Sequence, residues 1–243
     1  MVLMALLSPA QGVLPAHAGT APESERSSLY DLNDFTGSLS AGYDSHYIFR
    51  GTERGKDSAW TQIEFTIPET PLNVGAWYQK PFSASHLNPS KSSELDLWAL
   101  LNVEFFDGTL SLGAIGYLIP DGDAPDRFET AVEYSRTLGP VDVRFSVARD
   151  FRYKGWFFET GVAKSFSMTD RIRFDASAGL SYQWDYFANG GSWNHVGLNL
   201  AMPISLSEWF TIEPYIGATF ALEAIDDYQD DQLFGGVSLI LTF

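Results

Sequence analysis

The residues of this sequence that could do chemistry begin with its histidines. Histidine is the usual general base of hydrolases, and His46, His86 and His195 lie beyond the N-terminal segment. His86 has Ser83 and Ser85 nearby, but no order of nucleophile, base and orienting group accompanies any of the three. Isolated histidines of this kind more often form hydrogen bonds near the ends of loops than act in catalysis. The sequence therefore predicts no enzyme and no catalytic residue.

Three tryptophans form a second candidate set. Trp60, Trp77 and Trp98 have polar neighbours two positions away, which places them on the polar faces of three successive runs, towards their loop ends and near Tyr117. Indole rings stack on sugars and other flat solutes. We expect one aromatic patch that either binds a solute or plugs the interior, and the sequence leaves both readings open.

The same polar faces carry most of the expected interior charge. The acidic residues are Asp44, Glu64, Glu94, Asp96, Glu104, Glu129, Glu133, Asp142, Asp150, Glu159, Asp175 and Glu213, and the basic ones are Arg50, Arg144, Arg152 and Arg173. Twelve acids against four bases leave about eight negative charges, and an acidic lining favours cations in a pore. The alternative is that these charges pair and brace the wall.

No metal or cofactor site is expected. The segment 120–126 resembles a calcium loop only superficially, because Val132 stands where such a loop needs its bidentate glutamate. Cysteine is absent, which excludes thiolate chemistry. The net charge of -16 would repel nucleic acid, so no nucleic-acid partner is expected.

The elements that carry these residues alternate with period two. In residues 172–184, for example, Ile172, Phe174 and Ala176 alternate with Arg173 and Asp175. A helix cannot produce this pattern, because its apolar positions recur every three to four residues. Twelve such runs start near residues 36, 58, 72, 94, 109, 128, 141, 155, 171, 193, 210 and 232.

The connections between the runs alternate between tight and long. Tight ones carry turn residues, as at Asp107-Gly108, and the intervening ones are mostly longer and polar, as at Gly51 to Asp57 and Phe82 to Ser93. Transmembrane barrels have short periplasmic turns and long outer loops. The predicted fold is all-β: a transmembrane, antiparallel, up-and-down β-barrel of twelve strands over residues 36–243, with both ends on the periplasmic side.

The N-terminal segment is expected to lie outside the barrel. Residues 1–18 contain no charged Lys, Arg, Asp or Glu and end in Ala16-His17-Ala18, which fits a signal peptidase site. We expect a cleavable signal peptide over residues 1–18, rather than a hydrophobic N-terminal helix, and a periplasmic lead-in over residues 19–35.

Aromatic residues fall where lipid headgroups would lie. Tyr47, Phe49, Tyr78, Trp156 and Trp184 are expected at the loop ends of the apolar faces, and Phe65, Phe105, Phe166, Phe210 and Phe243 at the turn ends. The alternating C-terminal run that ends at Phe243 resembles the signal read by the barrel assembly machinery. Expected partners are therefore outer-membrane lipid and lipopolysaccharide, and that machinery during insertion.

Three short segments resemble a known family. The run from Gly42 to Gly51, in particular Tyr47-Ile48-Phe49-Arg50-Gly51, is similar to the opening of the TorF/Gcw_chp family of bacterial outer-membrane proteins, with His46 in place of an acidic residue. Residues 94–97 and 116–120 are also similar. The resemblance implies the fold and the outer-membrane location, and it supplies no substrate or catalytic residue.

Together these features predict an outer-membrane, porin-like channel of a Gram-negative bacterium for passive or facilitated passage of small solutes, with a preference for cations. The alternatives are a closed barrel with a structural or loop-mediated binding role and, less favoured, a surface hydrolase.

Overall fold

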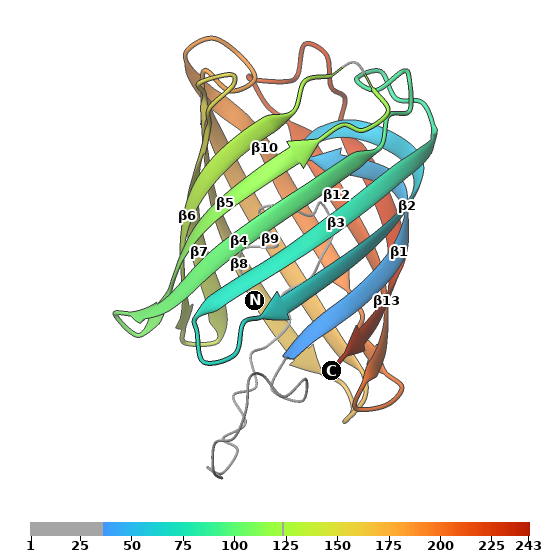
Figure 1. Cartoon of the computed structure of the whole chain (residues 1–243), viewed down its shortest axis with the longest axis vertical. Coiled ribbons are helices and arrows are strands. Elements are labelled where there is room, and N and C mark those ends of the chain that lie inside the picture. The colour runs from blue at the N-terminus through green and yellow to red at the C-terminus, as the bar shows by residue number, and fades with distance from the viewer. Residues whose placement is uncertain (1–35, 123) are drawn as a thin grey trace.

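The computed structural model describes residues 36–122 and 124–243, and these form one antiparallel β-barrel (Figure 1). Its strands are β1 (Thr36–Phe49), β2 (Thr52–Thr66), β3 (Leu72–Ser83), β4 (Glu94–Phe105), β5 (Gly108–Leu118), β6 (Arg127–Leu138), β7 (Val141–Asp150), β8 (Trp156–Ser167), β9 (Arg173–Trp184), β10 (Gly191–Ala201), β11 (Ile204–Ser205), β12 (Phe210–Ala221) and β13 (Gln232–Thr242). In this part of the chain, no helix is long and apolar enough to cross a bilayer. The proposed signal peptide and lead-in lie outside the described residues.

Twelve strands close the wall. Each pairs with its neighbours in sequence, β10 pairs with β12, and β1 pairs with β13 from Ser38 opposite Thr242 to Asp44 opposite Gly236. The two-residue β11 pairs only with the start of β12, in the connection between β10 and β12. The predicted twelve-stranded, up-and-down barrel is confirmed. Strand β1 begins and strand β13 ends at the same rim, the lower one in Figure 1.

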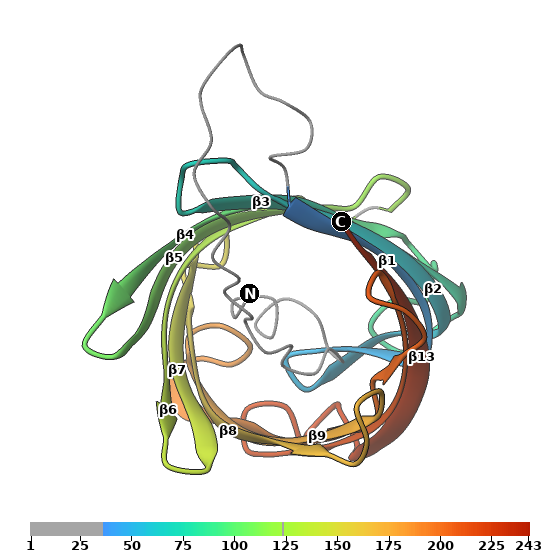
Figure 2. The same cartoon turned by 90° about the horizontal axis from the view of Figure 1, so that it is seen from below.

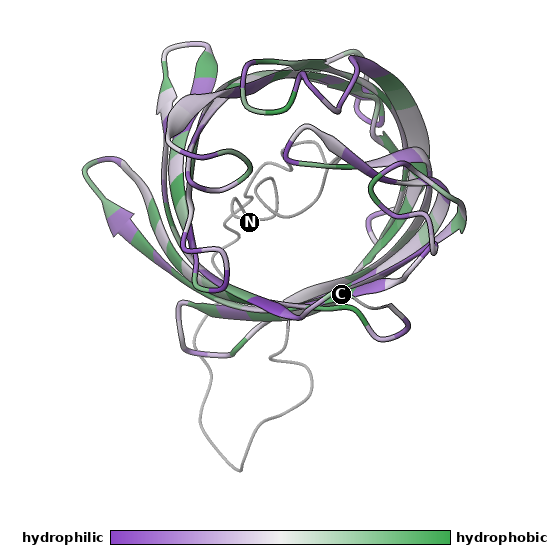
Figure 3. Ribbon diagram, turned by 90° about the horizontal axis from the view of Figure 1, so that it is seen from above, coloured by the Kyte–Doolittle hydropathy of each residue, from purple (hydrophilic) through white to green (hydrophobic). Residues whose placement is uncertain are grey.

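Period-two alternation positions the side chains. Along β6, Val132 points outward and is exposed, whereas Glu133 points inward and is buried. Val132 lies opposite Leu112 on β5 and Val147 on β7, so apolar residues form a continuous outer belt. Hydrophilic and hydrophobic residues alternate along the strands (Figure 3). Such a wall suits a lipid exterior and a polar interior.

Most of the predicted aromatic girdles lie on the outer face. Tyr78, Trp156 and Trp184 are exposed near the rim that carries the long loops, hereafter the outer mouth. At the opposite rim, the rings of Phe65 and Phe243 lie 6.0 Å apart across the β1–β13 seam region. Tyr47 and Phe49 depart from this pattern, because the outer ends of β1 and β2 leave the wall.

An outer loop is expected over residues 51–57, but residues 52–57 are instead part of β2, which begins at Thr52 rather than near residue 58. The outer ends of β1 and β2 therefore form an extended hairpin that is longer than the wall requires. We call residues 47–55 the inner hairpin, because it turns into the barrel (Figure 2).

Candidate functional site

The inner hairpin crosses the lumen. Tyr47, Ile48 and Phe49 are consecutive, yet they are only 1%, 4% and 4% exposed. Tyr47 and Phe49 pack with the interior residues of β3 to β5, and Ile48 packs on the opposite side against Tyr215 of β12. The prediction that Tyr47 and Phe49 face lipid was wrong. Both faces of a hairpin that leaves the wall are buried, so an apolar face in this segment does not indicate contact with lipid.

The backbone explains how the hairpin leaves the wall. The pairing of β1 with β2 shifts register between Tyr47 and Ile48. The turn is formed by Arg50, with φ of 50°, and Gly51, with φ of 82°, and two successive positive values are characteristic of tight hairpin turns. A Cβ at Gly51 would lie 2.7 Å from Cγ of His195 on β10, so glycine is required. The Arg-Gly pair of the family-like segment is thus the tip of the hairpin.

Arg50 fastens that tip to the far wall. Its Nη1 and Nη2 donate to Oε1 and Oε2 of Glu129 on β6 at 3.1 and 2.7 Å, and the two side chains are 3% and 0% exposed. Arg127 donates from Nη2 to Glu129 at 2.8 Å and from Nε to Asp150 at 2.8 Å. Tyr186, in the β9–β10 loop, also donates to Glu129. Burial raises the pKa of the Tyr186 phenol, which keeps it a donor.

Aromatic rings surround both guanidinium groups. Cζ of Arg50 lies 4.5 Å from the ring centroid of Phe157 and 4.7 Å from that of Tyr186. Cζ of Arg127 lies 5.1 Å from Tyr117 and 5.6 Å from Phe49. A cation over an aromatic face is attracted by the ring quadrupole. Two arginines, two carboxylates and several rings thus form a compact assembly between the hairpin tip and the wall. We call this assembly the constriction.

Three further hydrogen bonds hold the hairpin backbone. Asn194 of β10 donates from Nδ2 to the Arg50 carbonyl at 2.8 Å. The Glu53 N–H donates to Oε1 of Gln229 in the β12–β13 loop at 2.8 Å, and Ser85 of the β3–β4 loop donates to the Glu53 carbonyl at 3.2 Å. The hairpin is thus attached to the wall and to two outer loops.

The three tryptophans lie inside the barrel, together. Trp60, Trp77 and Trp98 are 4–5% exposed and belong to one cluster with Tyr47 and Tyr117. The rings of Tyr47 and Trp77 are 5.2 Å apart. This places the cluster against the inner hairpin, beside the constriction.

Glycines provide room for two of the indoles. The ring of Trp60 covers Gly42 and that of Trp98 covers Gly75, where an added Cβ would lie 2.4 and 2.2 Å from the rings. Trp60 also donates from Nε1 to Asp44 at 3.0 Å. Both rings therefore lie flat on the inner wall.

The remaining predicted charges are distributed along the wall. Arg144 pairs with Glu159 at 2.7 Å, and Arg173 pairs with Asp175 at 2.7 Å. Glu64 is buried in the lumen, as is Asp96. Glu104 lies two residues before the β4–β5 turn and is exposed.

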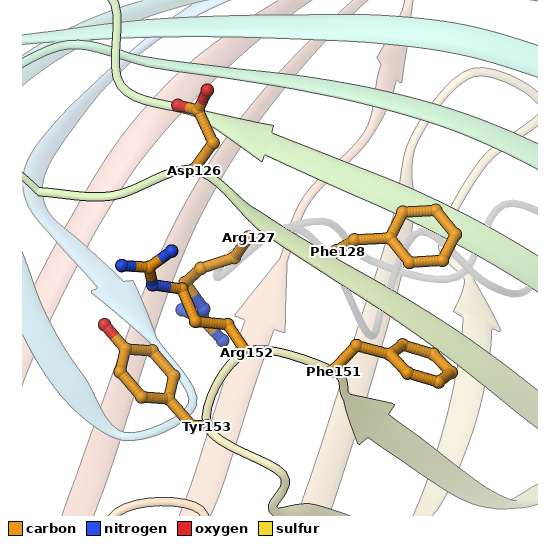
Figure 4. A pocket seen from close by; sticks show the side chains of 6 residues that line it. All are labelled: Asp126, Arg127, Phe128, Phe151, Arg152 and Tyr153. Carbon is orange, nitrogen blue, oxygen red and sulfur yellow. The ribbon is translucent and has the colours of Figure 1, made fainter.

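Arg152 does not line the lumen wall as predicted. It belongs to the outer β7–β8 turn and is exposed, because β7 ends at Asp150 and the alternation ends with it. Figure 4 shows Arg152 at a rim pocket with Arg127 and Tyr153, while the rings of Phe128 and Phe151 point away from them.

Sequence reasoning missed Arg127. The run predicted to start near residue 128 leaves Arg127 in the preceding connection, whereas Arg127 is the first residue of β6. It shares a face with Glu129 two positions on, and this spacing was the available signal.

A cavity of about 340 Å³ lies over the inner hairpin at the outer mouth. We call it the vestibule. Its lining residues are Phe49, Arg54, Glu94, Tyr117, Ile119, Ala124, Pro125, Arg127, Tyr153, Tyr186 and Phe187. Hairpin, wall and three outer connections all contribute, so the vestibule is open towards the loops and floored by the hairpin.

One serine–histidine contact bears on the hydrolase alternative. Oγ of Ser181 lies 2.6 Å from Nδ1 of His195, and both residues face the lumen. Gly51 packs on the imidazole, and Phe157 stacks near it at 6.4 Å. The hairpin turn covers this pair, which therefore supports the hairpin rather than facing the vestibule.

The Gcw_chp family model, described as a bacterial protein of unknown function, matches residues 32–232. The chain belongs to this family. The resemblance is confirmed, and the family-like opening contains the first half and the tip of the inner hairpin. A search of the curated proteins gives no match.

Solved structures share the fold. The KdgM porin is 9% identical with a TM-score of 0.57, over 85% of this chain and 99% of that one. The COG4313 outer-membrane channel from Pseudomonas putida F1 is 10% identical with a TM-score of 0.55, over 91% and 100%. The NanC porin is 9% identical with a TM-score of 0.53, over 85% and 98%. Together with the apolar belt, this fold places the protein in the bacterial outer membrane.

Proposed function

We propose that this protein is an outer-membrane channel for small solutes, and that the inner hairpin is its gate. The observation that carries the proposal is the Arg50–Glu129 pair, which joins the hairpin tip to the opposite wall. The hairpin is continuous with the wall at both ends and is otherwise held by hydrogen bonds, ion pairs and ring contacts. Such contacts can break and re-form without unfolding the barrel.

We further propose that the channel prefers cations. Within the described residues, the lumen carboxyls of Glu129, Asp150, Glu159 and Asp175 have arginine partners. Other lumen carboxyls in this part of the chain form no ion pair, and these are Asp44, Glu64, Glu94, Asp96, Glu133 and Glu213. When the hairpin is released and water reaches these carboxyls, they ionise, and their negative charge raises the local concentration of cations.

This negative charge also bears on the solute class. The KdgM porin has been determined in complex with an oligogalacturonate. A polyanion of that kind would be repelled by unpaired carboxylates along a passage. We therefore expect this channel to serve solutes that carry no large net negative charge.

Single-channel conductance in a planar bilayer tests the proposal. The wild-type protein should show brief openings, and Arg50→Gln should raise the open probability at least tenfold by loosening the tip. Arg144→Gln is the matched control, because Arg144 pairs with Glu159 at the same 2.7 Å but does not contact the hairpin. Absence of conductance in all three proteins would contradict a channel and favour a closed barrel. Reversal potentials in a salt gradient then measure the cation preference.

A further inference from the structure

The vestibule contains two opposite charges, Arg54 and Glu94, that attract each other without forming a direct ion pair. Arg54 of the inner hairpin donates from Nε to Oγ1 of Thr52 at 3.1 Å. Glu94 of β4 accepts from the Tyr47 hydroxyl at 3.0 Å and shares a hydrogen bond with the Asp96 side chain. Neither forms an ion pair within the described part of the chain, although both line the same cavity. Opposite charges that are held apart in a partly enclosed site are costly unless a ligand or water satisfies them.

The third charged group of the vestibule is already satisfied. Arg127 binds Glu129 and Asp150, and its guanidinium is surrounded by rings. It therefore contributes a flat, stacked surface more than a free charge. Arg54 and Glu94 are left as the two groups able to recognise charge on a solute.

The rest of the lining is largely apolar. Phe49 forms part of the floor, Tyr117 the wall, and Tyr153 and Phe187 belong to the outer connections. A cavity of about 340 Å³ is at the lower end of the range for small-molecule sites. It suits a solute of amino-acid or dipeptide size that carries a flat apolar group.

We infer that the vestibule binds a small zwitterion with an aromatic or apolar side chain, such as an amino acid or a dipeptide. The carboxylate of the solute binds Arg54, its ammonium group binds Glu94, and its side chain packs among the rings. This inference rests on the proposed channel function and names the solute class that would reach the hairpin first. A zwitterion has no net charge, which agrees with an acidic passage below.

Three related probes separate the two charge contacts. They are L-phenylalanine, 3-phenylpropanoate, which lacks the ammonium group, and 2-phenylethylamine, which lacks the carboxylate. Calorimetric titration of the detergent-solubilised barrel should give the tightest binding for L-phenylalanine. Each of the other two should bind about tenfold more weakly, because each lacks one charge-assisted contact.

Two variants assign the contacts. Arg54→Gln should weaken L-phenylalanine and 3-phenylpropanoate about tenfold and leave 2-phenylethylamine unchanged, whereas Glu94→Gln should weaken L-phenylalanine and 2-phenylethylamine only. Lys56→Gln is the matched control, since Lys56 directly follows the inner hairpin on β2, pairs with Glu53 and does not line the vestibule. It should leave all three affinities unchanged.

The outcomes separate the inference from the function on which it rests. No calorimetric binding of L-phenylalanine at millimolar concentration, or equal binding of L-phenylalanine and 3-phenylpropanoate, overturns the zwitterion site even if the protein conducts. Selective binding to a protein that never conducts supports the site and removes the channel.

Discussion

Removing either partner of the Arg50–Glu129 pair should release the inner hairpin, and the two removals should differ in size. Glu129→Gln leaves Arg50 without a carboxylate at a position where its side chain is 3% exposed. Breaking a buried pair in this way costs about 3–5 kcal/mol, because a charge remains unpaired. The rings of Phe157 and Tyr186 offset about 1 kcal/mol of this. A net loss of about 3 kcal/mol raises the released fraction about 150-fold.

Arg50→Gln should have a smaller effect. Glu129 keeps the Arg127 contact at 2.8 Å and the Tyr186 hydroxyl, so its charge is not left alone. Only the charge-assisted bonds to Arg50 are lost, which is worth about 1.5–2 kcal/mol. The released fraction should rise about 10- to 30-fold.

A single cysteine measures the released fraction. The chain has no cysteine, and Thr52 at the hairpin tip is 0% exposed, so Thr52→Cys should react with a thiol reagent only when the hairpin is released. When release and return are fast, the labelling rate follows the released population. We expect the order Glu129→Gln, then Arg50→Gln, then the parent Thr52→Cys protein, with Arg144→Gln as a neutral control. Equal rates in all four proteins, or a larger effect of Arg50→Gln, would refute the reasoning.

Three other predictions concern the wall, the tryptophan cluster and the loops. Val132→Arg should destabilise the barrel by about 2–4 kcal/mol, while Phe128→Arg nearer the outer rim should cost about 1 kcal/mol or less, as measured by denaturant unfolding in lipid vesicles. Trp98→Ala removes an indole packed flat on the inner wall, so basal conductance should rise and the thermal midpoint fall; an unchanged conductance with weaker solute binding would instead favour a binding role. The Lys80 ammonium and the Ser93 hydroxyl and N–H hold the pKa of Asp121 well below its usual range. The hydrogen bond from the Ser93 N–H to Asp121 therefore keeps its full strength above about pH 4 and weakens only below that pH. Hydrogen exchange of the Ser93 amide, corrected for its intrinsic rate, should therefore stay constant from about pH 7 to about pH 4.

The barrel could be predicted from the sequence because alternation is repeated in every wall strand. A strand between lipid and water shows its two faces directly in its residue types, as Val132 and Glu133 do on β6. The tight and long connections predict which rim of the barrel faces outward. The pairing of β1 with β13 closes the barrel by ordinary strand pairing. Where one face of a strand contacts lipid and the other contacts the polar interior, the local residue pattern is sufficient to predict the strand and its faces.

The inner hairpin could not be predicted in the same way, because its surroundings come from distant parts of the chain. Period-two alternation along β1 puts Tyr47 and Phe49 on the same face as Tyr43, and this face predicts contact with lipid. The register shift after Tyr47 interrupts that alternation. Ile48 between the two aromatics was a local sign, since three consecutive apolar residues indicate that both faces are buried.

The candidate site was predicted only in part. Trp60, Trp77 and Trp98 all lie inside because each is on the polar, inward face of its alternating strand. Arg50 faces inward for another reason, since it forms the turn of the hairpin. The partner of Arg50 could not be identified, since no local rule relates it to Glu129 on a strand across the lumen. The vestibule likewise depends on where separate loops meet.

The contacts of the inner hairpin also bear on the order in which this protein assembles. Arg50 is 79 residues from Glu129, Asn194 is 144 residues from Arg50, and Gln229 is 176 residues from Glu53. Contacts of such long sequence separation form late, after the intervening chain has been arranged. The wall strands must therefore be in place before the tip can be fastened. A newly inserted barrel would pass through an unsealed stage, so the speed of fastening decides how long the membrane leaks at each new copy.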